Sequence, residues 1–146
     1  MKYILTQNTK IVDGLVLYQI QAIKNFLYIT AGDLGGWVEK EENLSQDGNA
    51  WVYGDAQVYG DARVYGNAQV YGNAQVFGNA QVYGNACVYG DAQVYGNACV
   101  YGNARVYGNA RVLGRLSSED CYKESNSAYP SKNTTKKEVI VKSMVL

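Results

Sequence analysis

Residues 48–113 read GNAWVY-GDAQVY-GDARVY-GNAQVY-GNAQVF-GNAQVY-GNACVY-GDAQVY-GNACVY-GNARVY-GNARVL, which is one six-residue phrase repeated eleven times without insertion. The first, third and fifth letters are Gly, Ala and Val in every copy. A short fixed period of this kind is typical of a solenoid, in which each repeat packs only against its neighbours. The regularity therefore decides the fold class, and it leaves no place for a unique chemical site within the array.

The order of residues within one phrase predicts a short strand followed by a corner. Ala and Val lie two apart and alternate with the variable fourth residue and the aromatic sixth, which predicts a β-strand with Ala and Val on its inner face. Gly followed by Asn or Asp accepts a positive φ at low cost and so predicts a turn. Three such sides make a coil of 18 residues, and 66 residues give 66/18 ≈ 3.7 coils. Because Val and Ala fill its axis, the coil has no room for an internal ligand.

The phrase Val-Tyr-Gly-Asn-Ala-x resembles the hexapeptide repeat of left-handed β-helix proteins. Residues 31–56, AGDLGGWVEKEENLSQDGNAWVYGDA, resemble more narrowly the lead-in segment of the YdcK-like hexapeptide-repeat proteins, most specifically at residues 35–38 and 43–45. The resemblance covers roughly residues 1–113 and implies a left-handed coil, although parallel crossovers generally favour the right hand. It also implies a fold shared with acyltransferases, which are typically trimers, and a family often encoded in prophages.

The whole chain is predicted to be an all-β, single-stranded left-handed parallel β-helix with a hairpin cap. Residues 1–47 form the cap and a lead-in loop, residues 48–116 the β-helix, and residues 117–146 a divergent tail. Within the cap, residues 2–6 and 11–20 read as strands with a turn at Asp13-Gly14. The tail reads as a linker over residues 117–135 and as strand-like over 138–146. The apolar residues expected to pack over the first coil are Trp37, Val38, Leu44 and Trp51.

Composition excludes several classes of function. Lys+Arg and Asp+Glu both number 13, so no net charge recruits nucleic acid or an anionic membrane. No apolar stretch is long enough to span a membrane, and residues 1–7 are too polar for a secretory signal, so a cytoplasmic protein is expected.

Cys87 and Cys99 lie two sides apart and are predicted to be reduced thiols. With no histidine and no close cysteine pair, neither a metal site nor a cofactor is expected.

Side chains at the same place in successive coils are predicted to stack in columns on the outer surface. Such columns stabilise a sheet by mutual contact, and they also form a flat amphipathic surface of the kind enriched at protein interfaces. The sequence leaves both interpretations open. The tyrosines of the three columns are the candidate interaction surface. The columns are Tyr53, Tyr71, Tyr89 and Tyr107; Tyr59, Phe77, Tyr95 and Leu113; and Tyr65, Tyr83 and Tyr101.

Charges on the repeats argue against nucleic-acid binding. Arg63, Arg105 and Arg111 are predicted to lie on three different sides, so no side has a stripe of cations to follow a phosphate backbone. The acidic residues Glu39, Glu41 and Glu42 in the lead-in loop read either as a contact for a basic partner or as a solvated loop. An ice-binding surface would show Thr ladders, which this array lacks.

An enzyme is disfavoured because acyltransferases of this fold generally use a histidine base, and the chain has none. We therefore expect a non-catalytic protein that acts by surface contact with a protein partner, and a dimer or trimer of the chain itself is a further option. The prophage association implied by the resemblance suggests a modulator or inhibitor of a host defence complex. The alternatives are an acyl-CoA-dependent transferase with an unusual base and a purely structural assembly module.

Overall fold

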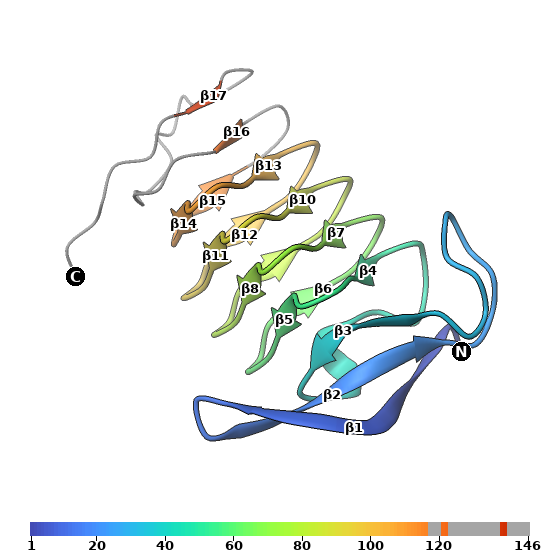
Figure 1. Cartoon of the computed structure of the whole chain (residues 1–146). Helices are drawn as coiled ribbons and strands as arrows, with labels where there is room; N and C mark the ends of the chain where they lie inside the picture. The colour runs from blue at the N-terminus through green and yellow to red at the C-terminus, as the bar shows by residue number, and fades with distance from the viewer. Residues whose placement is uncertain (117–120, 123–137, 140–146) are drawn as a thin grey trace.

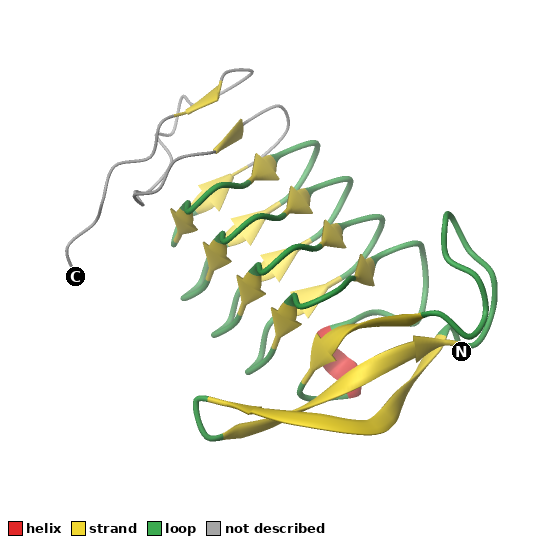
Figure 2. Ribbon diagram, viewed as in Figure 1, coloured by secondary structure: helices red, strands yellow, loops and turns green. Residues whose placement is uncertain are grey.

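The computed structural model of the chain describes residues 1–116, 121–122 and 138–139 (Figure 1). These residues form a coil of short parallel strands, with a hairpin across its N-terminal end (Figure 2). The prediction of an all-β solenoid is confirmed, and its left hand stays a prediction of the resemblance. The predicted linker and strand-like end lie outside the described residues, apart from two short strands given below.

Three parallel sheets form the walls of the coil, and each wall strand pairs with strands one coil before and after it. The first wall contains β5 (Gln57–Val58), β8 (Gln75–Val76), β11 (Gln93–Val94) and β14 (Arg111–Val112). The second contains β4 (Trp51–Val52), β7 (Gln69–Val70), β10 (Cys87–Val88) and β13 (Arg105–Val106). The third contains β6 (Arg63–Val64), β9 (Gln81–Val82), β12 (Cys99–Val100) and β15 (Arg115–Leu116).

The pairing register confirms the predicted period of the coil. Val58 lies opposite Val76, and Val76 lies opposite Val94, so each valine pairs with the one three phrases further along. Backbone N–H groups donate to the carbonyls of the next coil, as from Phe77 to Val94 at an N–O distance of 2.9 Å. Every Ala and Val at the invariant positions of the array is at most 1% exposed. The coil axis is therefore a packed core, as the alternation predicts.

Glycine is required at the corners for two separate reasons. Gly72 has φ +67°, a conformation that residues with a side chain rarely adopt. A Cβ added there would also lie 2.9 Å from the backbone nitrogen of Gly90, which occupies the same corner of the next coil. At Gly54, φ is +57° but no heavy atom lies within 4 Å of the added Cβ. Where corners of successive coils stack, a side chain is therefore excluded by contact with the next coil as well as by the positive φ.

The hairpin consists of β1 (Tyr3–Val12) and β2 (Leu15–Ala22), joined at the predicted turn. Asp13 and Gly14 both have positive φ, 52° and 80°, as a tight two-residue hairpin turn requires. The first strand is longer than predicted, because it continues through a register shift between Leu5 and Thr9. Thr6 supports this irregular stretch by donating its hydroxyl to the carbonyl of Gln19 at 2.8 Å.

Both faces of β2 carry buried side chains. Leu17 and Ile20 would lie on opposite faces of an alternating strand, and both are fully buried, but of the two only Ile20 belongs to the core cluster along the coil axis. β2 pairs with β3 (Leu34–Val38) through a second register shift, between Gln19 and Gln21, in which β3 carries the extra residue.

The parallel coil begins before the array. β3 pairs in parallel with β5, and Leu44, just after the 3₁₀ helix η1 (Glu41–Asn43), bridges to Val64 of β6. Residues 34–44 thus supply a first, degenerate coil below the repeats. Gly35 and Gly36 are needed here by close approach, since a Cβ on either would lie within 2.7 Å of side-chain or carbonyl atoms.

The cap buries an aromatic cluster against this first coil. Trp51 is fully buried and meets the rings of Tyr3 and Phe26 edge to face, with centroids 6.1 and 5.2 Å away. Val38 and Leu44 are buried as well, as expected. The expectation for Trp37 is wrong: it lies opposite Gln57 on the outer face, with the ammonium of Lys10 4.4 Å from its ring centroid. Its position in the strand corresponds to the outward fourth letter of the repeat.

At the other end of the coil the period shortens. Arg115 lies opposite Cys99, a spacing of 115 − 99 = 16 residues, because Gly114 is followed directly by Arg115 without the usual Asn-Ala. β16 (Cys121–Tyr122) then pairs in parallel with β13, and β17 (Glu138–Val139) pairs in parallel with β16. The second wall therefore continues past the array.

Candidate interaction surface

The three predicted columns form, and their rings stack at ladder spacing. In the column that contains Tyr71, centroids lie 4.8 Å apart for Tyr71–Tyr89 and 5.1 Å for Tyr89–Tyr107, with interplanar angles of 2° and 5°. The Tyr83 column has spacings of 4.8 and 5.3 Å, and the Phe77 column 5.1 Å on both sides of Phe77. Parallel, offset stacks at this distance are favourable aromatic contacts. The columns therefore have the stacked geometry that was predicted to stabilise the sheets by mutual contact.

The tyrosines lie outside the coil, but their ring faces are largely covered. Nearly all are half-buried, because each ring stacks on its neighbours. Burial raises the pKa of Tyr65 and of Tyr71, so both hydroxyls stay protonated well into the alkaline range. A partner would therefore meet ring edges and neutral hydroxyl groups rather than open ring faces.

One predicted contact residue is covered by the cap. Tyr59 is only 5% exposed, and its hydroxyl lies 3.3 Å from the carboxylate of Asp13 at the hairpin turn. Burial, with the nearby Asp13 carboxylate, raises the pKa of Tyr59 to about 12. Tyr59, the first residue of the Phe77 column, is thus inaccessible to a partner and belongs to the contact between hairpin and coil.

Polar ladders run beside the columns. On the first wall the amide of Gln75 donates to Gln57 at 3.0 Å, and that of Gln93 donates to Gln75 at 3.1 Å. At the corners, Asn67 donates to Asn85 at 3.1 Å, and Asn73 donates to the carboxylate of Asp91 at 3.2 Å. These side chains are consequently engaged with one another, and they stiffen the surface that a partner would meet.

The charged residues lie where the period placed them. Arg63, Arg105 and Arg111 are exposed and belong to the third, second and first walls respectively. The predicted acidic run is partly engaged: Glu39 accepts the backbone N–H of Gly60 at 2.9 Å, and Glu41 accepts the amide of Gln46 at 3.1 Å. A polar hollow of about 670 Å³ adjoins that run and is lined by Glu41, Glu42, Leu44, Ser45, Gln46, Arg63, Val64, Tyr65 and Gln81.

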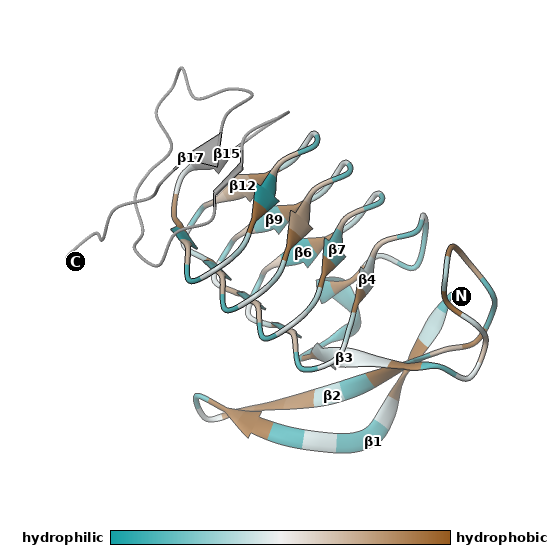
Figure 3. Ribbon diagram, turned by 45° about the horizontal axis from the view of Figure 1, so that its top comes forward, coloured by the Kyte–Doolittle hydropathy of each residue, from teal (hydrophilic) through white to brown (hydrophobic). Residues whose placement is uncertain are grey.

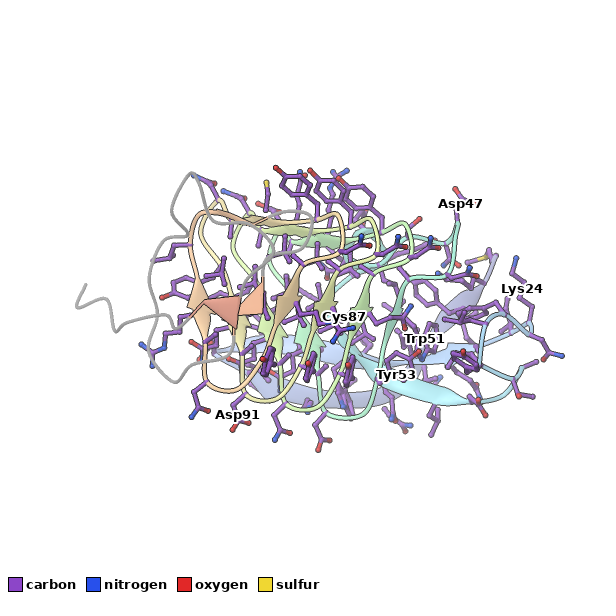
Figure 4. All side chains as sticks on the ribbon, turned by 90° about the horizontal axis from the view of Figure 1, so that it is seen from above. Lys24, Asp47, Trp51, Tyr53, Cys87 and Asp91 are labelled. Atoms are coloured by element: carbon purple, nitrogen blue, oxygen red, sulfur yellow. The ribbon has the colours of Figure 1, made fainter. Side chains whose placement is uncertain are left out.

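An apolar groove of about 330 Å³ lies on the second wall, and the sequence did not reveal it. Here the regular stack ends, because Tyr53 meets Tyr71 edge to face at 80° with centroids 6.0 Å apart. Figure 4 shows Tyr53 and Cys87 on this wall, beside Trp51. The groove is lined by Leu27, Tyr28, Tyr53, Gln69, Tyr71 and Cys87. The first two residues come from the loop between β2 and β3, which has no periodic signal that would have marked it.

The two cysteines of the array lie on different walls. Cys87 and Cys99 are unpaired and lie on the second and third walls, as predicted from their spacing. Burial raises the pKa of the Cys87 thiol, which keeps it protonated and a weak nucleophile. Within the part of the chain that the structure describes, no three acidic, cysteine or histidine side chains are grouped to hold a metal ion. That part also contains no helix with the length and apolar character needed to cross a membrane.

Comparison with known proteins finds similarity to one repeat family and to one protein of Escherichia coli. The family described as YdcK Beta solenoid repeat matches residues 56–72, 80–94, 92–106 and 104–115. A 40-residue segment is 45% identical to the protein named "Uncharacterized acetyltransferase YdcK" of Escherichia coli (strain K12), and it covers 27% of this chain and 12% of that protein. The likeness to that relative thus spans about an eighth of its length. The stacked hexapeptides of this chain are thus similar to the YdcK β-solenoid repeat over the matched residues.

Proposed function

We propose that the protein is a non-catalytic β-solenoid that acts by surface contact with a protein partner. The observation that supports this best is the Tyr71 column. Its half-buried rings are held in parallel by their own stacking on a rigid wall, so little side-chain entropy remains to be lost on binding. Tyrosine edges and hydroxyls offer both apolar contact and hydrogen bonds, and tyrosine is among the residues enriched at energetically dominant interface positions.

A more specific form of the proposal makes the partner a host defence complex that the protein modulates or inhibits. It rests on the prophage association implied by the resemblance of the lead-in segment and repeats. The chemistry of the walls is compatible with any partner that has a flat, polar-aromatic surface. Identification of the captured partner decides between this form and the general one.

The experiment is affinity capture from host lysate with wall-specific variants. Tyr71→Ser with Tyr89→Ser alters the second-wall column, and Tyr83→Ser with Tyr101→Ser is the matched pair on the third wall. We expect one partner to be captured in a saturable manner and to be lost with one pair while the other pair retains it. Thermal melting of each variant controls for loss of fold. Capture that survives both pairs unchanged would contradict the proposal.

A second candidate is an acyl-CoA-dependent transferase, favoured by the printed name of the Escherichia coli relative. Histidine is absent from the sequence, so a base other than the usual imidazole would be required. Titration calorimetry with acetyl-CoA separates the candidates, because heat of saturable binding would support the transferase. Mass in solution adds to this, since a trimer would favour an acyltransferase-like assembly and a monomer would favour the binder.

A further inference from the structure

The loop between β2 and β3 contains a two-residue turn whose first residue has an unusual backbone conformation. Phe26 and Ile29 exchange two backbone hydrogen bonds, of 3.0 and 2.7 Å, and leave Leu27 and Tyr28 at the tip. Leu27 has φ +49°, a left-handed conformation normally left to Gly, Asn or Asp. Its side chain is 52% exposed, and that of Tyr28 is 88% exposed. Strain and exposed apolar surface together at one tip have no evident role in folding.

This tip forms one edge of the apolar groove on the second wall. The Tyr53 ring lies edge to face against Tyr71 and so interrupts the parallel aromatic stack at the groove. The groove volume of about 330 Å³ is at the small end of the range for binding pockets and suits one large side chain with its neighbours. In Figure 3 the loop between β2 and β3 shows brown stretches among paler and teal ones.

The electrostatics beside the groove favour an acidic occupant. Arg105 lies opposite Cys87, one ladder step of about 4.8 Å beyond the groove lining. It is exposed, and within residues 1–116 it takes part in no ion pair. Asp91, at the corner after Tyr89, is engaged by the amide of Asn73 at 3.2 Å. An incoming carboxylate at this end of the groove would therefore lie near the Arg105 guanidinium, which has no ion-pair partner within residues 1–116.

We propose that the groove binds an aromatic side chain from an acidic segment of a partner protein, with the ring beside Tyr71 and the carboxylate at Arg105. This rests on the proposed function and names the site and the chemistry of the partner. A second copy of the chain is a poorer occupant. The loop that would be inserted, residues 23–30, contains Lys24 and no acidic residue, so it would place a cation near Arg105.

The test is an NMR titration with three short peptides: acetyl-Glu-Trp-Glu-amide, acetyl-Lys-Trp-Lys-amide and acetyl-Glu-Ala-Glu-amide. We expect saturable shifts at Leu27, Tyr28 and Tyr71 with the first peptide, and affinity at least about 5-fold weaker for the other two. Arg105→Gln should weaken the first peptide by about 2–5-fold, as for an exposed ion pair. Arg111→Gln, on the first wall, is the matched control and should leave the affinity unchanged.

Leu27→Gly separates binding from folding. Glycine relieves the positive φ at this position, so the melting temperature should be unchanged or higher while peptide binding is lost. Equal affinity for all three peptides, no shift at the groove at millimolar concentration, or retained binding in Leu27→Gly would overturn the proposal. A concentration-dependent dimer abolished by Leu27→Gly would also overturn it, because the occupant would then be a second copy. If the peptides fail while the wall variants still lose the captured partner, the groove proposal fails and the proposed function stands.

Discussion

The array and the N-terminal cap solve the same problem of coil stability in opposite ways. In the array, identical valines, alanines and corner glycines recur at every coil, and each of these residues meets copies of itself in the neighbouring coils. In the cap, nearly every contact is unique: a buried lysine, an edge-to-face aromatic cluster, a pair of sterically required glycines and two register shifts. Repetition provides a rigid support, and the features that distinguish one part of the surface from another come from the irregular end.

The largest expected effect compares one position of the phrase in the two regions. Trp51 and Gln75 both occupy the variable fourth letter, but the indole is fully buried under the cap, whereas the Gln75 amide lies in an outer ladder. We expect Trp51→Ala to lower the free energy of unfolding by about 3–5 kcal/mol. Gln75→Ala should lower it by about 1 kcal/mol or less. Chemical denaturation measures both, and similar losses would mean that the cap does not enclose Trp51.

The next effect compares an interior corner with one at the start of the array. Gly72→Ala meets a positive φ and a backbone nitrogen 2.9 Å away, whereas Gly54→Ala meets the positive φ alone. The conformational part costs about 1–2 kcal/mol at either site. We expect Gly72→Ala to cost at least about 1 kcal/mol more than Gly54→Ala in denaturant unfolding. Equal costs would show that the corners are not in contact.

The next comparison uses the pH dependence of the free energy of unfolding, to which the cap contributes a buried lysine. Lys2 is fully buried, and its ammonium donates to the carbonyls of Ala50 at 2.7 Å and Gly48 at 3.3 Å. Burial, assisted by nearby Lys24 and opposed by Asp47, lowers the pKa of Lys2 from 10.5 to about 8. The unfolded chain therefore binds more protons between these values, and the free energy of unfolding should rise with pH above about 8. Lys2→Met should abolish the rise, and a wild-type profile without it would contradict the burial of the ammonium.

Above pH 10 the tyrosines should reverse that trend. Burial raises the pKa of Tyr3, Tyr53 and Tyr71 above the ordinary value of 10, so these hydroxyls ionise more readily in the unfolded chain. Their stabilising effect is complete below pH 10 and is lost as the pH rises further. Tyrosinate absorbance recorded alongside circular dichroism should show ionisation and unfolding together. Full ionisation of a folded coil would contradict the packing of the columns.

The smallest effect concerns the aromatic stack itself. A double-mutant cycle on Tyr71 and Tyr89, which stack at 4.8 Å, should give a coupling of about 0.5–1.5 kcal/mol. The cycle on Tyr53 and Tyr71, edge to face at 6.0 Å beside the groove, should give a coupling of different size, since the ring contact differs. Identical couplings would indicate that the break in the stack is without energetic consequence.

What the sequence could predict follows the same division. The array is periodic, so its walls, its corners and the three columns followed from spacing, and Arg63, Arg105 and Arg111 fell on separate walls as expected. The Asp13-Gly14 turn followed from local turn chemistry. In each of these features, the residue type at a position determines the local backbone conformation without help from distant segments.

The rest depended on contacts between segments distant in the chain. Trp37 and Trp51 look equivalent in sequence, but one faces outward and the other is enclosed by Tyr3 and Phe26. The register shifts in the pairing of β2 with β1 and with β3 leave no mark in the alternation. The groove could not be predicted because it is formed by a non-repetitive loop against the array, and the positive φ of Leu27 has no sequence signal.

The period of the coil can be measured directly with pyrene labels on pairs of cysteines. Gln75→Cys with Gln93→Cys, in a background where the native cysteines are serine, places the labels one full coil apart on directly paired strands. Gln75→Cys with native Cys87 alone retained places the labels closer in the sequence but on different walls. We predict excimer fluorescence from the first pair and monomer fluorescence from the second. Excimer from the second pair, or none from the first, would contradict a three-walled coil in which each wall is one hexapeptide.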